Sequence, residues 1–304
     1  MIAPVFFLFA TIFPPAIDDW KRVESAAPEV PLPAVAKEYG LQESEGATYS
    51  LGSKKFKLAL FRLKDTTGAV AFEQSLQGAG KIFRHQNYVF QTLEGTAPRG
   101  ALDAFLLPAL PKIDRSANPN LVSYLPREHR VSGSERYVVG PESLRAFESR
   151  IPVAAAGFDF AGEMQLARYK TPSGEAVLAL FRFPNHAIAR QQLDSLQKAI
   201  PEGAITRQGP LVTLVLPVDP SQPLKPETAQ SLAGLIQYKA TVILDKAPEK
   251  PQPNAGLLLI GIFKLAGILM LMCLGLGLIF AFGRIWARRL AGKPEEEAMT
   301  SLNI

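Results

Sequence analysis

The sequence LALFRL at residues 58–63 returns as LALFRF at residues 178–183, 120 positions later. Aligned at that offset without a gap, residues 53–79 and 173–199 are identical at eleven positions. Five identities form the run LALFR, and the other six lie before and after it in the same register. Matches that continue through a strand, a loop and a helix are difficult to obtain by chance. The sequence therefore predicts that one structural unit occurs twice.

Each copy reads as strand, turn, strand, capped helix and strand. Asp65 and Asn185 stand at equivalent places between a strand and a helix, where a side chain is needed to cap the helix. GSKK and PSGE each supply a tight turn before the LALFR strand. The expected elements are 47–51, 56–63, 68–79 and 88–93 in the first copy, and 164–169, 176–183, 187–200 and 211–218 in the second.

The expected helix at 187–200 places Ala189, Leu193, Leu196 and Ile200 on one apolar stripe. Alternating strands with helices on one face indicate a two-layer arrangement. The predicted fold class is α+β, with two tandem copies of a two-layer strand-strand-helix-strand domain plus one C-terminal transmembrane helix. Between the copies we expect a strand at 136–139 and a short helix that begins at Pro141. Residues 218–244 are expected to supply a further helix and a last strand.

The C-terminal region contains a long apolar segment, residues 255–283, in which Lys264 is the only charge. Its uncharged stretch 265–282 would form about 27 Å of helix, close to the roughly 30 Å thickness of the hydrocarbon core. We predict a transmembrane helix, with Lys264 near the lipid interface; the alternative is a functional intramembrane lysine. Residues 248–254 form a Pro-rich spacer before it. Four cations follow the segment and place the tail, 284–304, in the cytoplasm: Arg284, Arg288, Arg289 and Lys293.

The N-terminus begins with an apolar run that suits the core of a signal peptide, predicted here as residues 1–16. No Lys or Arg precedes the run, and Ala16 follows two prolines, so a buried strand or a truncated start is the alternative. With export, the chain divides into a first α+β domain with its connecting segment (17–150) and a second α+β domain (151–247). Both would be extracytoplasmic and anchored in the cell inner (cytoplasmic) membrane as a single-pass protein.

Composition excludes several functions. Without the membrane segment and tail, the chain has 28 basic and 25 acidic residues, and no Lys/Arg stripe is interleaved with aromatics. Nucleic-acid binding is therefore not expected. The single cysteine, Cys273, lies within the apolar segment, which excludes disulfides and cysteine-based zinc sites from the soluble part. We expect no cofactor and no metal.

Several motifs resemble a bacterial domain-of-unknown-function family of envelope proteins. They are DDW (18–20), EYGL (38–41), ATY (47–49), KDTTGA (64–69), YLPREHRV (124–131), YVVGPESL (137–144) and SGEAVLALFRFP (173–184). The resemblance covers nearly the whole chain, and it implies a signal segment, paired α+β domains and a C-terminal transmembrane helix. It carries no activity, so no catalytic residue follows from it.

Three residues are candidate ligand contacts. Arg62 and Arg182 occupy the same place in the two copies, where a repeated arginine would hold an anion; the alternative is pairing with a carboxylate. His129 lies beside Glu128 and two arginines and would serve as an acid–base or anion-binding group, or else lie solvated in a loop.

The leading hypothesis is a membrane-anchored, extracytoplasmic, non-enzymatic binding or envelope-assembly protein. Its expected partners are the lipid bilayer and a membrane or envelope protein. Two alternatives stay open. One is an envelope hydrolase with a site between the two repeats that involves His129, and the other is a tail-anchored cytosolic protein.

Overall fold

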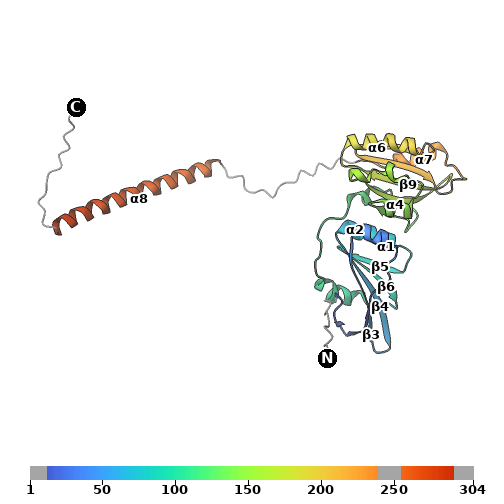
Figure 1. Ribbon diagram of the computed structural model, residues 1–304, viewed down its shortest axis with the longest axis horizontal. Coiled ribbons are helices and arrows are strands. Elements are labelled where there is room, and N and C mark those ends of the chain that lie inside the picture. Colours follow the sequence, from blue (N-terminus) through green and yellow to red (C-terminus); the bar gives the residue numbers. More distant parts are fainter. Residues whose placement is uncertain (1–11, 239–254, 291–304) are drawn as a thin grey trace, which may run out of the picture. The chain divides into compact units, whose positions relative to one another are not determined.

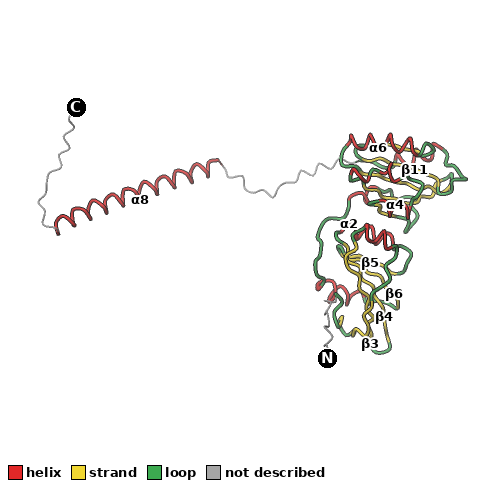
Figure 2. Tube along the Cα trace, in the orientation of Figure 1, coloured by secondary structure: helices red, strands yellow, loops and turns green. Residues whose placement is uncertain are grey.

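The computed structural model describes residues 12–238 and 255–290. The chain divides into two compact units, 1–239 and 240–304, and each is considered by itself. The first unit is α+β with two antiparallel sheets, and the second contains one long helix (Figures 1 and 2). The α+β class is confirmed. The predicted boundary between residues 150 and 151 falls inside the first unit.

The first sheet has the strand order β1-β2-β3-β4-β6-β5, and every pair of neighbours is antiparallel. The turn at Gly52 joins β3 to β4, as the sequence predicted. The strands are β1 (Ala16–Ile17), β2 (Trp20–Ala26), β3 (Leu41–Leu51), β4 (Lys54–Leu63), β5 (Lys81–His85) and β6 (Tyr88–Glu94).

The second sheet has the strand order β10-β11-β9-β8-β7 and is also antiparallel throughout. The predicted strand near residue 136 forms its edge, β7. The strands are β7 (Arg136–Val138), β8 (Glu163–Thr171), β9 (Gly174–Arg182), β10 (Ala204–Gln208) and β11 (Leu211–Pro217).

The two sheets share a strand order and a pairing register. The order β3-β4-β6-β5 in the first sheet matches β8-β9-β11-β10 in the second. Glu43 faces Arg62 across β3 and β4, and Glu163 faces Arg182 across β8 and β9. These partners lie 120 positions apart. Beyond the helices, the pairs of the β5–β6 hairpin recur in β10–β11 at an offset of 123.

Helices connect and cover the sheets. Asp65 Oδ1 accepts from the Gly68 amide at 2.8 Å, and Asn185 Oδ1 accepts from Ile188 at 2.9 Å, as expected of N-caps. The helices of the first unit are α1 (Pro33–Glu38), α2 (Thr66–Ser75), α3 (Arg99–Ala101), α4 (Pro141–Phe147), α5 (Val153–Ala156), α6 (His186–Ala199) and α7 (Pro226–Gly234). Four single turns complete them: η1 (Leu102–Leu106), η2 (Leu107–Ala109), η3 (Asn120–Tyr124) and η4 (Phe158–Phe160).

Helix α2 ends four residues before the predicted end at residue 79. Gly78 and Gly80 follow it with φ of +92° and +110°, which turns the chain into β5. Helix α6 continues for about one turn more and buries Ala189 and Leu196 of the predicted stripe. This difference in helix length accounts for the change of offset from 120 to 123. The hairpin strands β5 and β10 were not predicted.

The expectation of two layers is wrong, because both sheets are covered on both faces. Six successive residues of β9 are buried, which a strand covered on one face does not allow. Leu178 and Leu180 face a core with α2 and α7, whereas Ala179 and Phe181 face a core with α6. The first sheet likewise has α1 and α2 on one face and the turns η1 and η2 on the other. Helices α1 and α2 lie between the two sheets (Figure 1).

Hydrogen bonds from the end of helix α1 connect the first sheet to the second. The carboxylate of Glu38 accepts hydrogen bonds from the backbone amides of Glu142 at 2.7 Å and Ser143 at 2.9 Å, and from the Ser143 hydroxyl. These amides open helix α4, whose N-cap residue, Gly140, has no side chain to offer. Glu38 therefore caps a helix that lies about 100 residues later. Next to it, buried Tyr39 donates to the carbonyl of Tyr137 at 2.6 Å.

The described chain begins inside the core of the first sheet. Phe13 is fully buried and lies edge-on to Tyr49, with ring centroids 6.1 Å apart. The Tyr49 hydroxyl donates to the carbonyl of Pro14 at 2.8 Å. Residues 1–11 of the predicted signal peptide lie outside the described residues, whereas within 12–16 Phe13 is buried in the fold.

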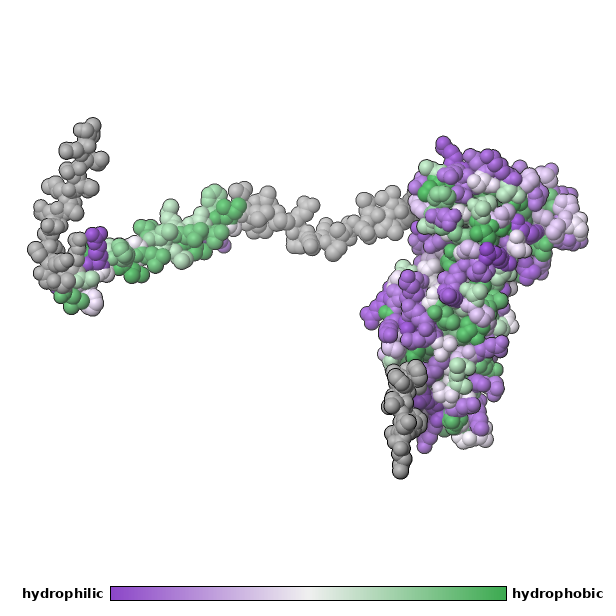
Figure 3. All heavy atoms as spheres, viewed as in Figure 1, coloured by the Kyte–Doolittle hydropathy of each residue, from purple (hydrophilic) through white to green (hydrophobic). Residues whose placement is uncertain are grey.

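The second unit contains helix α8 (Ala255–Leu290), within which Ile260–Ala287 is long and apolar enough to cross a membrane. Its mean hydropathy is 2.6, and its side chains are exposed rather than packed in a core (Figure 3). The predicted spacer (248–254), the tail beyond residue 290 and most of the predicted last strand lie outside the described residues.

Candidate functional site

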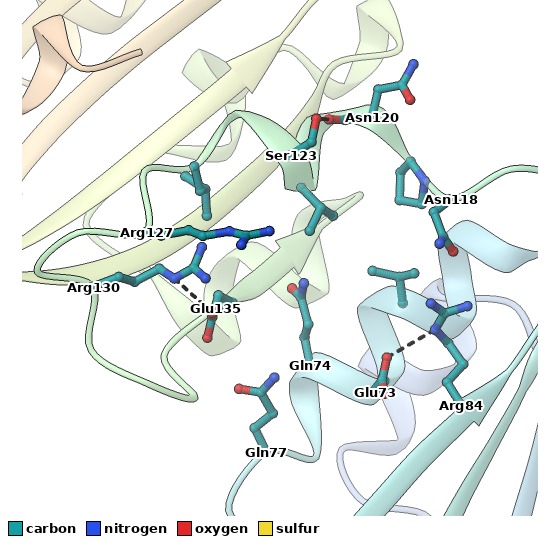
Figure 4. Close-up of a pocket in the computed structure, with 14 residues that line it drawn as sticks. Glu73, Gln74, Gln77, Arg84, Asn118, Asn120, Ser123, Arg127, Arg130 and Glu135 are labelled. Carbon is teal, nitrogen blue, oxygen red and sulfur yellow. Dashed lines mark hydrogen bonds and ion pairs between the residues drawn. The ribbon is translucent and has the colours of Figure 1, made fainter.

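A polar pocket of about 590 Å³ lies where helix α2, strand β5 and the segment 118–135 meet (Figure 4). Its volume falls within the range of small-molecule sites, roughly 300–1,000 Å³. Helix α2 presents Glu73 and Gln74 on one wall, and Gln77 follows in the turn directly after the helix. The other wall comes from the segment that leads into the second sheet.

Charged residues form two ion pairs on opposite sides of the pocket. Arg84 Nε contacts Glu73 Oε2 at 3.0 Å, and Arg130 Nε contacts Glu135 Oε1 at 3.0 Å. Each carboxylate therefore already has a cation beside it. Both pairs are drawn with dashed lines in Figure 4.

Arg127 is the third arginine of the pocket. Its guanidinium makes no hydrogen bond or ion pair within residues 12–238, and it extends into the space between Ser123 and Gln74 (Figure 4). Three guanidinium groups against two carboxylates leave one positive charge in the lining. An arginine can offer two parallel N–H donors to a carboxylate or phosphate.

Unsatisfied polar atoms gather around this pocket. Four buried side-chain atoms of the described residues lack a hydrogen-bond partner, and two of them, Gln77 Oε1 and Glu135 Oε2, belong to its lining. A third, Gln165 Oε1, sits directly behind the wall, since Gln165 Nε2 donates to Gln74 Oε1 at 3.0 Å. A buried polar atom that no group satisfies costs about 1–3 kcal/mol, so these atoms favour a ligand or water beside them. Unsatisfied polar groups of this kind call for an explanation, and a functional site is one of the usual ones.

The predicted anion contacts Arg62 and Arg182 lie outside this pocket. Arg62 is buried and contacts Glu43 through Nε at 3.0 Å and Nη2 at 2.7 Å, with Gln42 also accepting from it. The hydrogen bond from Arg62 lowers the pKa of Glu43 below its ordinary value. Arg182 is exposed and lies 3.7 Å from Glu163. In both sheets the repeated arginine thus faces a carboxylate on the neighbouring strand.

His129 lines a different hollow, of about 300 Å³, between the β8–β9 turn and helix α7. Glu128, Glu227 and Ser231 also line this hollow, so carboxylates and a hydroxyl share it with His129. His129 is nevertheless exposed, and its imidazole makes no hydrogen bond within the described residues. Its backbone is left-handed, with φ of +59°. The hollow belongs to the second sheet and not to the junction of the two sheets.

The membrane-flanking residues lie on helix α8. Lys264 is near the start of the apolar stretch Ile260–Ala287, and Arg284 and Arg289 are near its end. Arg288 lies on the same helix. Among residues 12–238 and 255–290, no cluster of three or more metal-ligating side chains occurs.

Comparisons with known proteins return no match, whether with protein-family models, curated proteins or solved structures. The resemblance to a family of envelope proteins therefore stays a prediction. Arg127 and His129 both lie in the stretch YLPREHRV (124–131), of which the sequence predicted only His129 as a ligand contact. No periodicity or motif distinguishes Arg127 from the neighbouring Arg130.

Proposed function

We propose that this protein is a single-pass membrane protein that binds a polar ligand in an extracytoplasmic domain without transforming it. The pocket with the unpaired Arg127 is the observation that carries the binding role. Ser123, the hydroxyl residue in its lining, donates to the carbonyl of Asn120, and neither His nor Cys lines the pocket. The lining therefore suits recognition better than nucleophilic chemistry.

Helix α8 would be the anchor in the inner membrane, with the bulk of the chain outside and the C-terminus in the cytoplasm. The cations near residue 284 support this orientation, because positively charged residues accumulate on the cytoplasmic side. The N-terminal apolar run supports export. An envelope protein that contacts the second unit would be the route by which binding is passed on.

We further propose that the two sheets are copies of one ancestral domain, as the repeat in the sequence predicts. Their shared strand order, the recurring Glu–Arg partners and the equivalent helix caps support this origin. The copies have since diverged, because the pocket is lined by α2 of the first copy and not by α6 of the second.

Protease accessibility in spheroplasts tests the proposal, with an epitope on the C-terminal tail. Digestion of the large domain with survival of the tail fits the proposed topology. Protection of the large domain until lysis would instead favour a tail-anchored cytosolic protein.

An envelope hydrolase that uses His129 is the second candidate, and the presence of Glu128, Glu227 and Ser231 in the same hollow favours that role. A hydrolytic site needs the base within hydrogen-bond reach of its nucleophile, about 2.6–3.2 Å. No such bond joins His129 to these residues within the described chain, so the binding function is the better supported. Hydrolysis of an ester panel by the full chain, lost in His129→Ala, would reverse that order.

A further inference from the structure

We propose that the pocket at the junction of the two sheets binds a small carboxylic acid that also carries amide groups, such as a peptide C-terminus or an N-acylated amino acid. This inference rests on the proposed binding function and names the chemistry of its ligand. The charge of the lining, the amides that surround Arg127 and the absence of an aromatic platform each contribute to it.

The charge of the lining selects a monoanion. The Glu73–Arg84 and Glu135–Arg130 pairs each neutralise one cation, so Arg127 alone is left to attract a ligand. A carboxylate carries one negative charge, whereas a phosphate monoester carries about 1.5 to 2 at pH 7. A phosphate monoester would leave part of its charge unpaired beside Glu73 and Glu135. A carboxylate matches the single surplus guanidinium and can accept two N–H donors from it.

Amide side chains supply the remaining recognition. Four of them line the pocket: Gln74, Gln77, Asn118 and Asn120. Because Gln74 Oε1 already accepts from Gln165, the amide nitrogen is the group that Gln74 can offer. Each side-chain amide has both a carbonyl acceptor and N–H donors, which is what a peptide group needs.

The pocket offers no aromatic surface on which a large ring could stack. None of its lining residues is aromatic, and Val70, Val122, Leu125 and Pro119 are its apolar members. A ring such as a nucleobase or a sugar face normally stacks on an aromatic side chain. A flexible acid with amide groups needs no such surface.

Titration of the full chain in detergent micelles with three probes tests this chemistry. The probes are N-acetyl-dialanine, the same compound with a C-terminal amide, and glycerol 3-phosphate. We expect the acid to bind about tenfold or more tightly than its amide, since a hydrogen-bonded charge contributes that much discrimination. The phosphate should bind more weakly than the acid, and added salt should weaken the acid but not the amide.

Three variants locate the effect. Arg127→Gln keeps N–H donors but removes the charge, and it should abolish the preference for the acid. Arg115→Gln is the matched control, because Arg115 is an exposed arginine three residues before the segment 118–135 and outside the pocket, and it should change nothing. Glu73→Gln frees the charge of Arg84 and should tighten the acid by about twofold to fivefold. All three variants should melt within about 2 °C of the parent, because these side chains lie at the surface or line the pocket.

Equal binding of the acid and its amide would overturn the inference while leaving a binding role for the pocket. Tighter binding of the phosphate, or no binding of the acid, would overturn it as well. Loss of the preference in Arg115→Gln would show that the effect is not specific to the pocket. Protection of the large domain in spheroplasts would refute the proposed location, whereas the proposed ligand chemistry would still stand.

Discussion

The cap that Glu38 provides to helix α4 yields the most direct test of how the two sheets are joined. Glu38→Ala would leave the amides of Glu142 and Ser143 without their acceptor, and the Ser143 hydroxyl would lose it too. Loss of an N-cap costs about 0.5–2 kcal/mol, and hydrogen bonds to a charged group add to this. Because Glu38 is partly exposed, we expect a total of about 2 kcal/mol.

For a unit of this size, that loss corresponds to a decrease in Tm of about 4–8 °C. Near-UV circular dichroism of the full chain in micelles reports it, because Tyr39 and Tyr137 are buried at the same junction. Glu142→Gln is the matched control. It removes an exposed ion pair with Arg145 on the same helix and should lower Tm by less than about 2 °C.

Gly140 provides a second perturbation of the same contact. A Cβ at this position would lie 2.5 Å from Glu38 Oε2, so Gly140→Ala should displace the carboxylate and reproduce most of the loss. Melting of Glu38→Ala within about 1 °C of Glu142→Gln would show that the cap from Glu38 does not stabilise the fold. A Gly140→Ala variant more stable than the parent would show the same.

Three further outcomes are expected. Phe13→Ala should destabilise the first sheet by about 3–5 kcal/mol, because the ring is fully buried. The intact mass of the mature chain should show that Phe13 is retained, and a mature N-terminus beyond Phe13 would contradict this packing. Glu43→Gln should flatten the acid side of the curve of stability against pH. Arg62 lowers the pKa of Glu43 in the folded state, so the ion pair stabilises the fold fully above about pH 4.5, and this stabilisation is lost as the pH falls through the lowered pKa of Glu43. With Glu43 43% exposed, the effect in urea titrations should stay below about 1 kcal/mol, and a larger one would refute this account. Asn185→Ala should cost about 1 kcal/mol through loss of the cap of α6, and unchanged thermal unfolding would show the cap to be dispensable.

Much of the local structure could be predicted from the sequence. The turn before LALFR, the caps Asp65 and Asn185, and the apolar segment after residue 255 are local signals, and the structure has the corresponding elements. The cover on both faces of each sheet could also have been predicted from the sequence, because LALFR places apolar residues on both faces of its strand. Treating it as an alternating strand concealed the second layer.

The pocket could not be predicted in the same way. Helix α2 and the segment that carries Arg127 are about 50 residues apart, and neither contains a motif that points to the other. The cap from Glu38 to helix α4 depends on a still longer separation. Contacts of this kind arise from tertiary packing, and a single sequence does not display them as a pattern.

Helix α2 also has a consequence for the time course of synthesis. It covers the first sheet with Phe72, which lies edge-on to Phe61, while other residues of α2 contact β7 and β8 of the second sheet. Ser143, the partner of Glu38, is synthesised 105 residues after it, and at a synthesis rate of 5–20 residues per second this delay is roughly 5–20 s. During this interval the nascent first half presents an uncovered apolar helix face and an unused carboxylate. Until the second half is made, that exposed face leaves the intermediate prone to aggregation.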